Sequence, residues 1–410
     1  MSAHAGGILR GLRIVEGSAF VAAPLGGMSL AQLGADVIRF DPIGGGLDHA
    51  RWPVTADGHS MFWAGMNKGK RSIAVDIRQP RGQELLTALI TAPGADAGVF
   101  STNFPARGWL AYEKLAARRA DLVMVNLLGR RDGGSEVDYT VNPQLGFPGL
   151  TGPSASPEPV NHVFPAWDAI AGNMIATAML AALRHRDRTG EGQLVTLALK
   201  DVGLAMLGHL GMIAEAQVGG VDRPRYGNNL YGAFGRDFAT RDGERAMVVG
   251  LTDMQWGCLL KATGLSDDVG RLGGLLRIDL AEEGNRFRAR EALAALFVPW
   301  FAERTLAEVS AVFDTHRVTW GPYRTVSQAL AQDPDLSTAH PMFSLLDQPG
   351  IGPYLAPASP LDFSKVARLP AAPAPLLGQH TDEILQDLLG LSAAEVGALH
   401  DAGVVAGPTT

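Results

Sequence analysis

The sequence predicts an α/β protein whose larger part is an open, doubly wound parallel sheet. Short apolar segments alternate with helix-like segments through residues 1–200, a pattern typical of parallel strands joined by crossover helices. The chain has 410 residues, more than one ordinary domain holds, so a second domain is expected. Hydrophobic residues make up 46% of the chain and charged residues 19%, a composition that supports a large core.

The first three predicted elements form a βαβ unit. Residues 12–16 are a buried strand, and 22–33 are a helix that Gly34 ends as a C-cap. Residues 36–41 are the next strand, and Asp41 stands where dinucleotide-binding folds place the acid that binds ribose. The turn after the first strand lacks the GxGxxG pattern, so close packing of helix on strand is favoured over an NAD site.

The alternation of strands and helices continues beyond this unit. Strands are predicted at 72–76, 97–100 and 121–127, with helices at 82–90 and 112–119. These segments extend the same parallel sheet.

The pattern changes in the middle of the chain. A stretch containing Gly, Asn and Arg at 219–235 interrupts it, and an apolar strand at 247–250 begins a smaller unit. Helices are predicted in that unit at 254–263, 286–302, 305–315 and 325–332.

A connecting arm is expected after the smaller unit. Pro and Gly are frequent from 334 to 375, and a terminal helix is predicted at 381–389. The predicted domains are a large domain at 1–215, a small domain at 225–330, and a return arm with the C-terminal part of the large domain at 335–410.

Composition and short motifs argue against several classes of function. The net charge is −7 and no basic stripe is present, so nucleic acid is not an expected partner. Cys258 is the only cysteine, which rules out a disulfide framework within the chain and a thiolate-rich metal site. Since no HExxH or similar cluster occurs among the ten histidines, no metal is expected either.

A cytoplasmic protein with no membrane partner is expected. Residues 1–7 have neither a basic start nor an apolar run, so no signal peptide is predicted. The longest apolar run, 169–183, contains Asn173 and is shorter than the roughly 20 residues that a membrane span needs. We interpret this run as a buried core helix.

Asp168 stands where that apolar helix should begin, in the segment Ala-Trp-Asp-Ala. The commonest role of an aspartate at a helix start is that of N-cap. The helix N-terminus also stabilises negative charge, which favours an anionic carboxylate that can act as a nucleophile. The two roles are compatible.

Two loops that follow or precede predicted strands carry groups suited to a nucleotide. Residues 67–72 contain three cations, including Lys70, that can bind phosphate, although a solvated loop is the more ordinary explanation. Asn103, Phe104 and Arg107 follow the fourth strand, at the carboxyl edge where open α/β sheets bind ligands. Phe104 can stack on a base and Arg107 can pair with a phosphate, or the loop is a hydrophobic anchor.

A third loop follows the fifth strand. Arg130 and Arg131 lie there among glycines and can hold a substrate carboxylate. An exposed basic turn is the alternative that the residues alone favour.

Several segments together resemble the family III CoA transferases, a family that also contains the 2-methylacyl-CoA racemases. These segments are 11–41, 70–73, 103–104, 168–193 and 377–382. The resemblance implies a Rossmann-like large domain made from both ends of the chain and a smaller α+β domain from its middle. It also implies an interlocked homodimer.

The resemblance implies that CoA binds along the large domain as part of an acyl-CoA substrate, with no tightly bound cofactor. The residues that match CoA-contact positions of the family are Val21, Ala22 and Ala23 near the pantetheine, with Lys70, Asn103, Phe104 and Arg107. One departure is Pro42, where many members carry an arginine for the nucleotide.

A second departure argues against racemase activity. Racemases place a catalytic histidine just before an aspartate, and that register here gives Val137 and Asp138. Valine cannot transfer a proton. Asp253 falls near the racemase's supporting glutamate, but alone it does not replace the histidine.

The resemblance therefore implies a transferase in which Asp168 is the nucleophile. Segments 146–152, 165–168 and 228–238 resemble one kind of member in particular. That resemblance implies an intramolecular CoA transfer between the C1 and C4 carboxylates of mesaconate, through an aspartyl-CoA thioester. Backbone donors for the oxyanion are expected in the turn around Gly146 and at the helix start after Asp168. The candidates for holding the acyl group and the freed dicarboxylate are Arg130, Arg131, Gly146, Asn228, Tyr231 and Arg236.

Two alternatives remain open. One is an intermolecular CoA transferase that uses another dicarboxylate as donor or acceptor. The other is a non-catalytic protein that binds acyl-CoA or a nicotinamide nucleotide.

Overall fold

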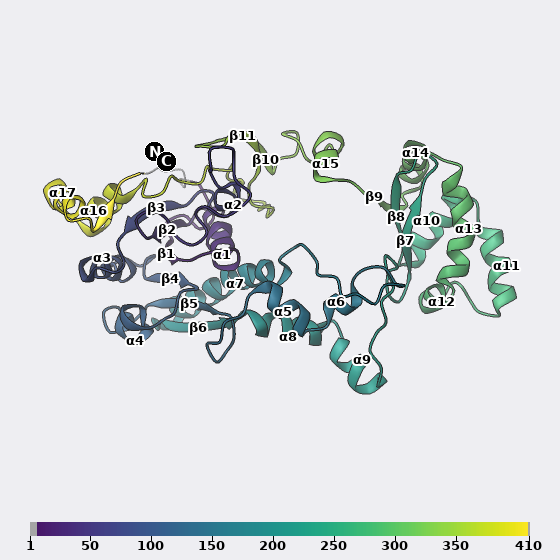
Figure 1. The fold of residues 1–410 in the computed structure, drawn as a ribbon, viewed down its shortest axis with the longest axis horizontal. Helices are drawn as coiled ribbons and strands as arrows, with labels where there is room; N and C mark the ends of the chain where they lie inside the picture. The colour runs from purple at the N-terminus through teal and green to yellow at the C-terminus, as the bar shows by residue number, and fades with distance from the viewer. Residues whose placement is uncertain (1–5, 409–410) are drawn as a thin grey trace. The chain divides into compact units, whose positions relative to one another are not determined.

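The computed structural model describes residues 6–408; residues 1–5, on which part of the signal-peptide expectation rests, lie outside the described residues. Its chain divides into two compact units, whose elements are labelled in Figure 1. The first unit contains the chain up to Leu145, Val163–Ile213, and the chain from Asp333 onward. The second contains Gly146–His162 and Ala214–Gln332. Gly146–His162 therefore belongs to the second unit, although the sequence places it inside the predicted large domain.

The first unit is built on a seven-stranded sheet in the order β12-β3-β2-β1-β4-β5-β6. All neighbouring strands are parallel except β12, which pairs antiparallel with β3. The order 3-2-1-4-5-6 is that of doubly wound folds, so the predicted α/β fold with a parallel-sheet core is confirmed. The strands are β1 (Arg13–Gly17), β2 (Asp36–Asp41), β3 (Arg71–Val75), β4 (Val99–Thr102), β5 (Val123–Leu128), β6 (Gln193–Ala198) and β12 (Val405–Ala406).

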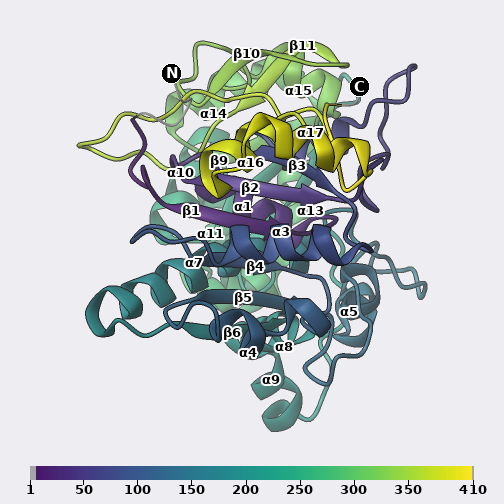
Figure 2. The same cartoon turned by 90° about the vertical axis from the view of Figure 1, so that its left-hand side faces the viewer.

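Helices cover both faces of this sheet (Figure 2). α1 (Ala22–Ala31) and α7 (Ala166–Thr189) pack together on one face. α3 (Pro80–Ile90), α4 (Tyr112–Ala116) and α16 (Thr381–Leu389) lie over the other face. Because both faces are covered, the inner strands are buried along most of their length, including polar residues such as Arg39 of β2.

The remaining elements of the first unit surround the sheet. They are α2 (Met61–Met66), η1 (Gly108–Leu110), α5 (Asp138–Gln144), α8 (Leu199–His209), α17 (Ala393–Asp401) and the antiparallel strands β10 (Phe343–Gln348) and β11 (Gly352–Pro357). α9 (Met212–Gly219) crosses the boundary between the units in sequence.

Glycines allow α1 to approach both its strand and α7 closely. A Cβ on Gly27 would lie 1.7 Å from Oε2 of Glu16 on β1, which confirms the predicted packing of helix on strand. A Cβ on Gly26 would lie 3.0 Å from the carbonyl oxygen of Gly172 on α7. The start of α7 is thereby fixed against the start of α1.

α7 is longer than predicted, with 24 residues. Its length and composition would suffice to cross a membrane. However, it packs on α1 and β5, and its Arg186 guanidinium donates to the carbonyls of Ala95 and Ala97 at 3.0 and 2.8 Å. These contacts agree with its interpretation as a core helix.

The second unit combines an antiparallel sheet with helices. Its strands, in the order β7-β8-β9, are β7 (Phe234–Ala239), β8 (Arg245–Gly250) and β9 (Thr319–Pro322). Its helices are α6 (Phe147–Leu150), α10 (Asp253–Thr263), α11 (Ser266–Leu276), α12 (Glu283–Arg288), α13 (Arg290–Ala302), α14 (Leu306–His316) and α15 (Val326–Gln332). Buried aromatic residues form a core of its own: Phe234, Phe238, Trp256, Phe297, Phe301 and Phe313.

Candidate active site

Asp168 is the third residue of α7 and lies in its first turn. The N-cap residue is Pro165, so the prediction that Asp168 itself caps this helix is wrong. The helix already begins at Ala166, and the N–H of Ala169 bonds to the carbonyl of Pro165 at 2.9 Å. The helix can begin before Asp168 because a side chain of another element binds the N–H groups of its first turn.

Asp138, the first residue of α5, supplies that cap. Its Oδ2 accepts the backbone N–H of Trp167 at 2.8 Å and that of Asp168 at 3.2 Å. These amides belong to the first turn, where no helical carbonyl is available to them. Since Trp167, Asp168 and Ala169 all have partners for their N–H groups, the start of α7 offers no free oxyanion donor at these positions.

The ionisation of Asp168 differs from the prediction. Burial is the largest cause that raises the pKa of Asp168 to about 7; the charge of Asp138 raises it too, and Arg51 lowers it. The helix N-terminus does favour the anion, but burial and a second carboxylate outweigh it. The carboxylate is therefore mostly charged only above about pH 7, not throughout the neutral range.

Arg51 is the cation whose charge acts on Asp168. Its guanidinium carbon lies 5.5 Å from the ring centroid of Phe20 and 5.1 Å from that of Phe62, both cation–π distances. Sequence reasoning missed Arg51 because it lies in an irregular loop with no motif. Only the tertiary contacts bring it to the site.

The loop between β1 and α1 is held by side chains from two directions. Phe20 has a positive φ of 72°, which is strained for a residue with a Cβ, and its N–H donates to Oδ2 of Asp48 at 2.9 Å. Asn103 accepts the N–H of Ala19 at 3.0 Å and donates to its carbonyl at 2.8 Å. The loop then enters α1 at Val21.

This arrangement places several predicted CoA contacts together. Val21 is the N-cap residue of α1, and Ala22 and Ala23 are buried in its first turn. Asn103 lies beside them, with its amide engaged by the loop backbone. The CoA contacts themselves stay predictions.

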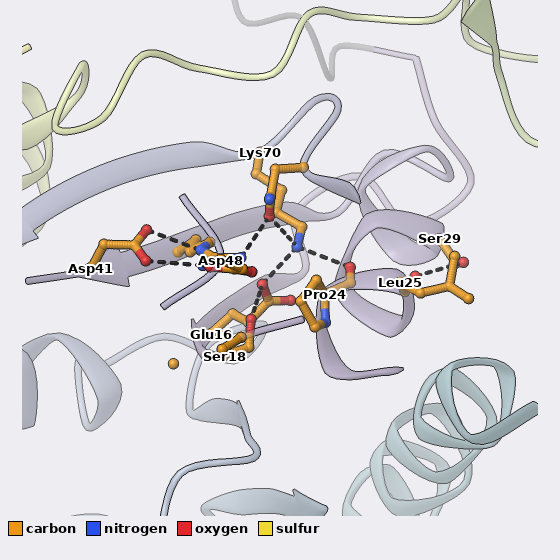
Figure 3. Close-up of polar contacts among 12 residues, drawn as sticks. Glu16, Ser18, Pro24, Leu25, Ser29, Asp41, Asp48 and Lys70 are labelled. Atoms are coloured by element: carbon orange, nitrogen blue, oxygen red, sulfur yellow. Dashed lines mark hydrogen bonds and ion pairs between the residues drawn. The ribbon is translucent and has the colours of Figure 1, made fainter. Parts of the chain in front are cut away.

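Lys70 lies in a buried network rather than in an exposed loop (Figure 3). Its Nζ pairs with Oε1 of Glu16 at 2.6 Å and donates to the carbonyl of Pro24 and to Oδ1 of Asn67, both at 2.9 Å. Burial lowers the pKa of Lys70 to about 8. With its ammonium enclosed, the alternative of a solvated loop is wrong for Lys70, and a direct phosphate contact gains no support.

Arg39 continues this network towards the loop. Its guanidinium donates two hydrogen bonds of 2.9 Å to the carboxylate of Asp41 and one of 2.7 Å to Oδ1 of Asp48. Asp41 is fully buried against this guanidinium, so it is not placed as a ribose ligand. The network connects Arg39 through Asp48 to the strained backbone at Phe20.

A cavity of about 520 Å³ opens at the carboxyl ends of β2 and β4. Its wall is largely apolar and includes one guanidinium, that of Arg107. Such a lining suits a flat aromatic ring next to an anion. The lining residues are Phe40, Pro42, Gly45, Gly46, Leu47, Ile77, Phe104, Pro105, Arg107, Trp109 and Leu110.

The predicted substrate cations of the first unit are paired with carboxylates. Arg130 binds Asp132 at 2.7 Å and Arg131 binds Asp201 at 2.9 Å, and both arginines are exposed. This geometry matches the exposed basic turn that was the alternative. Their substrate role stays a prediction.

The other predicted substrate residues belong to the second unit. Gly146 has φ 83°, Asn228 is exposed, and the hydroxyl of Tyr231 donates to Glu215 at 2.7 Å. Arg236 pairs with Glu291 at 2.9 Å. Their contact with substrate also stays a prediction.

No group of three or more His, Cys, Asp or Glu that could hold a metal occurs within residues 6–408. At the racemase histidine position, Val137 is half-exposed and directly precedes Asp138. Asp253 is 91% exposed and lies 3.6 Å from Arg286 in the second unit. Val137 therefore stands where a racemase has its catalytic histidine, and the two acids of the racemase pattern are Asp138 and Asp253.

The sequence model of CoA-transferase family III matches residues 9–381. That match covers most of the chain. The chain belongs to CoA-transferase family III. Its parallel-sheet fold agrees with the fold that the resemblance implied, while the role of Asp168 stays a prediction.

Individual relatives of this family III CoA transferase match over nearly its whole length. The 2-methylfumaryl-CoA isomerase of Chloroflexus aurantiacus is 71% identical, over 98% of each chain. The succinyl-CoA–D-citramalate CoA-transferase of the same organism is 28% identical, over 96% of this chain and 97% of the relative. A solved CAIB/BAIF family protein from Brucella suis has a TM-score of 0.75 at 27% identity, covering 93% of this chain and 100% of that one.

Proposed function

We propose that the protein is a 2-methylfumaryl-CoA isomerase, which moves CoA between the C1 and C4 carboxylates of mesaconate. The observation that carries this proposal is the 71% identity, over 98% of both chains, to the protein of that name. Relatives that transfer CoA between different acids are far less similar, at 28% for the D-citramalate enzyme. The intermolecular alternative is therefore second.

Asp168 is the proposed nucleophile. One of its oxygens attacks the C1 thioester carbonyl, the carbon–sulfur bond breaks, and CoA leaves as thiolate with the electron pair. The thiolate attacks the aspartyl carbonyl of the mixed anhydride and releases mesaconate. The C4 carboxylate then attacks the aspartyl thioester and expels the CoA thiolate, which leaves a second mixed anhydride. The thiolate attacks the C4 carbonyl of that anhydride, which forms the C4 thioester and frees the Asp168 carboxylate.

Burial of Asp168 supports this role. A buried carboxylate with a pKa of about 7 is a stronger base, and so a better nucleophile, than an exposed one. The attack moves its negative charge outward onto the substrate. The amides of Trp167 and Asp168 already bind Asp138, so they are not proposed as oxyanion donors.

Arg51 is the proposed anchor of the freed dicarboxylate. Mesaconate carries two negative charges while CoA is on the enzyme, and it must turn over without leaving. Within residues 6–408, Arg51 is the cation whose charge acts on Asp168, and its guanidinium lies at cation–π distance from Phe20 and Phe62. Retention keeps the effective concentration of mesaconate high for the second attack.

The cavity beside Phe104 is the proposed site of the adenine of CoA, with Arg107 beside the nucleotide phosphates. Val21, Ala22 and Ala23 lie where the pantetheine would approach α1. Asn103 then acts by fixing Ala19 next to that path, and Lys70 by fixing Glu16 under α1. Since Pro42 is part of the cavity wall, it contributes apolar contact where an arginine would contribute charge.

An interlocked homodimer is proposed on the family resemblance. A mass by light scattering of twice the 43.3 kDa of one chain would support the dimer, and the mass of a single chain would contradict it.

The function is tested by incubating the enzyme alone with 2-methylfumaryl-CoA and following the thioesters by LC–MS. The isomerase proposal expects 3-methylfumaryl-CoA with no added acid. Labelled free mesaconate separates the alternatives, because its incorporation into product would favour the intermolecular transferase. Binding of CoA thioesters without turnover would leave a non-catalytic acyl-CoA-binding protein.

A further inference from the structure

We propose that Asp138 is a positioning residue for Asp168, which fixes the turn that carries the nucleophile and places a negative charge behind it. The proposal rests on the proposed function, in which Asp168 attacks a thioester. It goes beyond that function because it assigns a task to a residue that touches no substrate in the mechanism above.

The geometry shows how Asp138 holds the nucleophile. A single oxygen, Oδ2, binds the N–H groups of both Trp167 and Asp168, so the backbone of the nucleophile itself is tied to α5. Asp138 is 1% exposed, which keeps water from competing for these bonds. A capping bond of this kind is worth about 1 kcal/mol to a helix.

The second oxygen of Asp138 points to a role beyond capping. Oδ1 is buried and has no hydrogen-bond partner among the described residues. A cap alone needs one acceptor oxygen, which an asparagine or a serine supplies without a buried charge. The carboxylate therefore brings a negative charge close to Asp168 that the capping geometry does not require.

Among residues 6–408, Asp138 is the acid whose charge raises the pKa of Asp168. The elements that pack most extensively on α7 are α1, α5, α8, β5 and β6, and α1, β5 and β6 contain no titratable side chain. On α8, Lys200 binds Gln144 and Asp201 binds Arg131, while His209 is the last residue of that helix. Tyr139 on α5 is half-exposed. Asp138 and Arg51 remain as the charged groups that act on Asp168.

The negative charge of Asp138 also affects the reaction of Asp168. Two carboxylates in one buried site repel each other, which destabilises the resting anion of Asp168. When the Asp168 oxygen bonds to C1 and the carbon–sulfur bond breaks, the charge passes to the departing thiolate. The repulsion from Asp138 is then relieved, so the step is easier than for a lone buried carboxylate.

Asp138→Asn separates the two tasks. The amide oxygen can still accept both backbone N–H groups, but the charge is gone. We expect the acid limb of the kcat/KM profile for 2-methylfumaryl-CoA to move to lower pH, because the charge that raised the pKa of Asp168 has been removed. We also expect the rate on the high-pH plateau to fall by roughly two- to fivefold, because the nucleophile is less basic.

The matched control is Asp382→Asn, which removes one negative charge from the first turn of α16 instead. It should leave the acid limb in place. Asp138→Ala removes both cap and charge and should lower the melting temperature as well, which a purely electrostatic role would not do.

A carbon-13 titration of labelled aspartates, with Asp168→Asn to identify the signal, measures the ionisation of Asp168 without substrate. If the wild-type enzyme does not isomerise the thioester, the proposed function fails while this titration still tests the inference. A signal and an acid limb that stay unmoved in Asp138→Asn would overturn the inference, even if the isomerase activity is found.

Discussion

A Cβ on Gly172 of α7 would lie 2.9 Å from the carbonyl oxygen of Ala22 on α1. The two helices therefore cross without room for one more methyl group. This contact links the helix that carries Asp168 to the helix whose start lies on the proposed path of the pantetheine.

Gly172→Ala is expected to push these helices apart. Overpacking of this kind costs about 1–3 kcal/mol of stability, and the displaced α7 should lower kcat as well. The control is Gly270→Ala in α11, where an added Cβ meets no atom within 4 Å and helix propensity favours alanine. Thermal unfolding and isomerase assays check both variants; a fully active, equally stable Gly172→Ala would contradict the packing argument.

Replacing Asp168 with asparagine should stabilise the protein at alkaline pH. The folded-state pKa of about 7 lies above the unfolded value near 3.9, so the folded protein keeps a proton that the unfolded chain has lost between these pH values. Wild-type stability therefore falls as pH rises from about 4 to 7, by an amount on the order of 3–4 kcal/mol.

The asparagine side chain cannot ionise, so the Asp168→Asn variant escapes that loss. Urea titrations at pH 4.5 and pH 8 should give similar stabilities for the two proteins at the lower pH and a more stable variant at the higher. An equal difference in unfolding free energy between the two proteins at both pH values would show that Asp168 is not a buried acid of raised pKa.

The fold was predictable because the first unit follows a simple alternation. β1, α1 and β2 were each expected within a few residues of their observed bounds, since apolar runs delimit them. The predicted C-cap at Gly34 is wrong, because α1 ends at Ala31 with Gln32 as its C-cap. β6 and β12 were missed. β6 has only half of its residues facing the core, and β12 has two residues, too few for any pattern.

The site was less predictable than the fold. Asp168 was found from its place before an apolar helix, but its cap and the direction of its pKa shift were not. Both depend on Asp138, which comes from a helix thirty residues earlier. Lys70 was expected at a surface, since three adjacent cations give no sign that Glu16 will bury one of them.

Arg51 tests the retention of the freed dicarboxylate. Arg51→Gln removes the charge that lowers the pKa of Asp168, so the acid limb of activity should move to higher pH. Free mesaconate should also escape during turnover, and KM should rise by about tenfold or more, as expected when a charge-assisted bond is lost. Arg118→Gln, which removes an exposed arginine paired with Glu84, is the control. Unchanged release of mesaconate would remove Arg51 as the anchor.

Phe104 tests the nucleotide cavity. Phe104→Ala should raise KM for acyl-CoA by roughly tenfold with little effect on kcat, because stacking on a base is worth about 1–3 kcal/mol and acts far from the reacting carbonyl. Phe363→Ala changes a partly exposed phenylalanine of the same unit outside this cavity and should leave KM as it is. Equal effects of both changes would place the adenine elsewhere.

The central claim is that Asp168 becomes covalently linked to CoA. Enzyme mixed with 2-methylfumaryl-CoA is quenched with hydroxylamine, digested, and the peptide containing residue 168 is weighed by mass spectrometry. The account predicts an aspartyl hydroxamate at Asp168 that appears only with substrate and is absent from Asp168→Ala, which is inactive. An unmodified Asp168 during turnover, or full activity in Asp168→Ala, would contradict it.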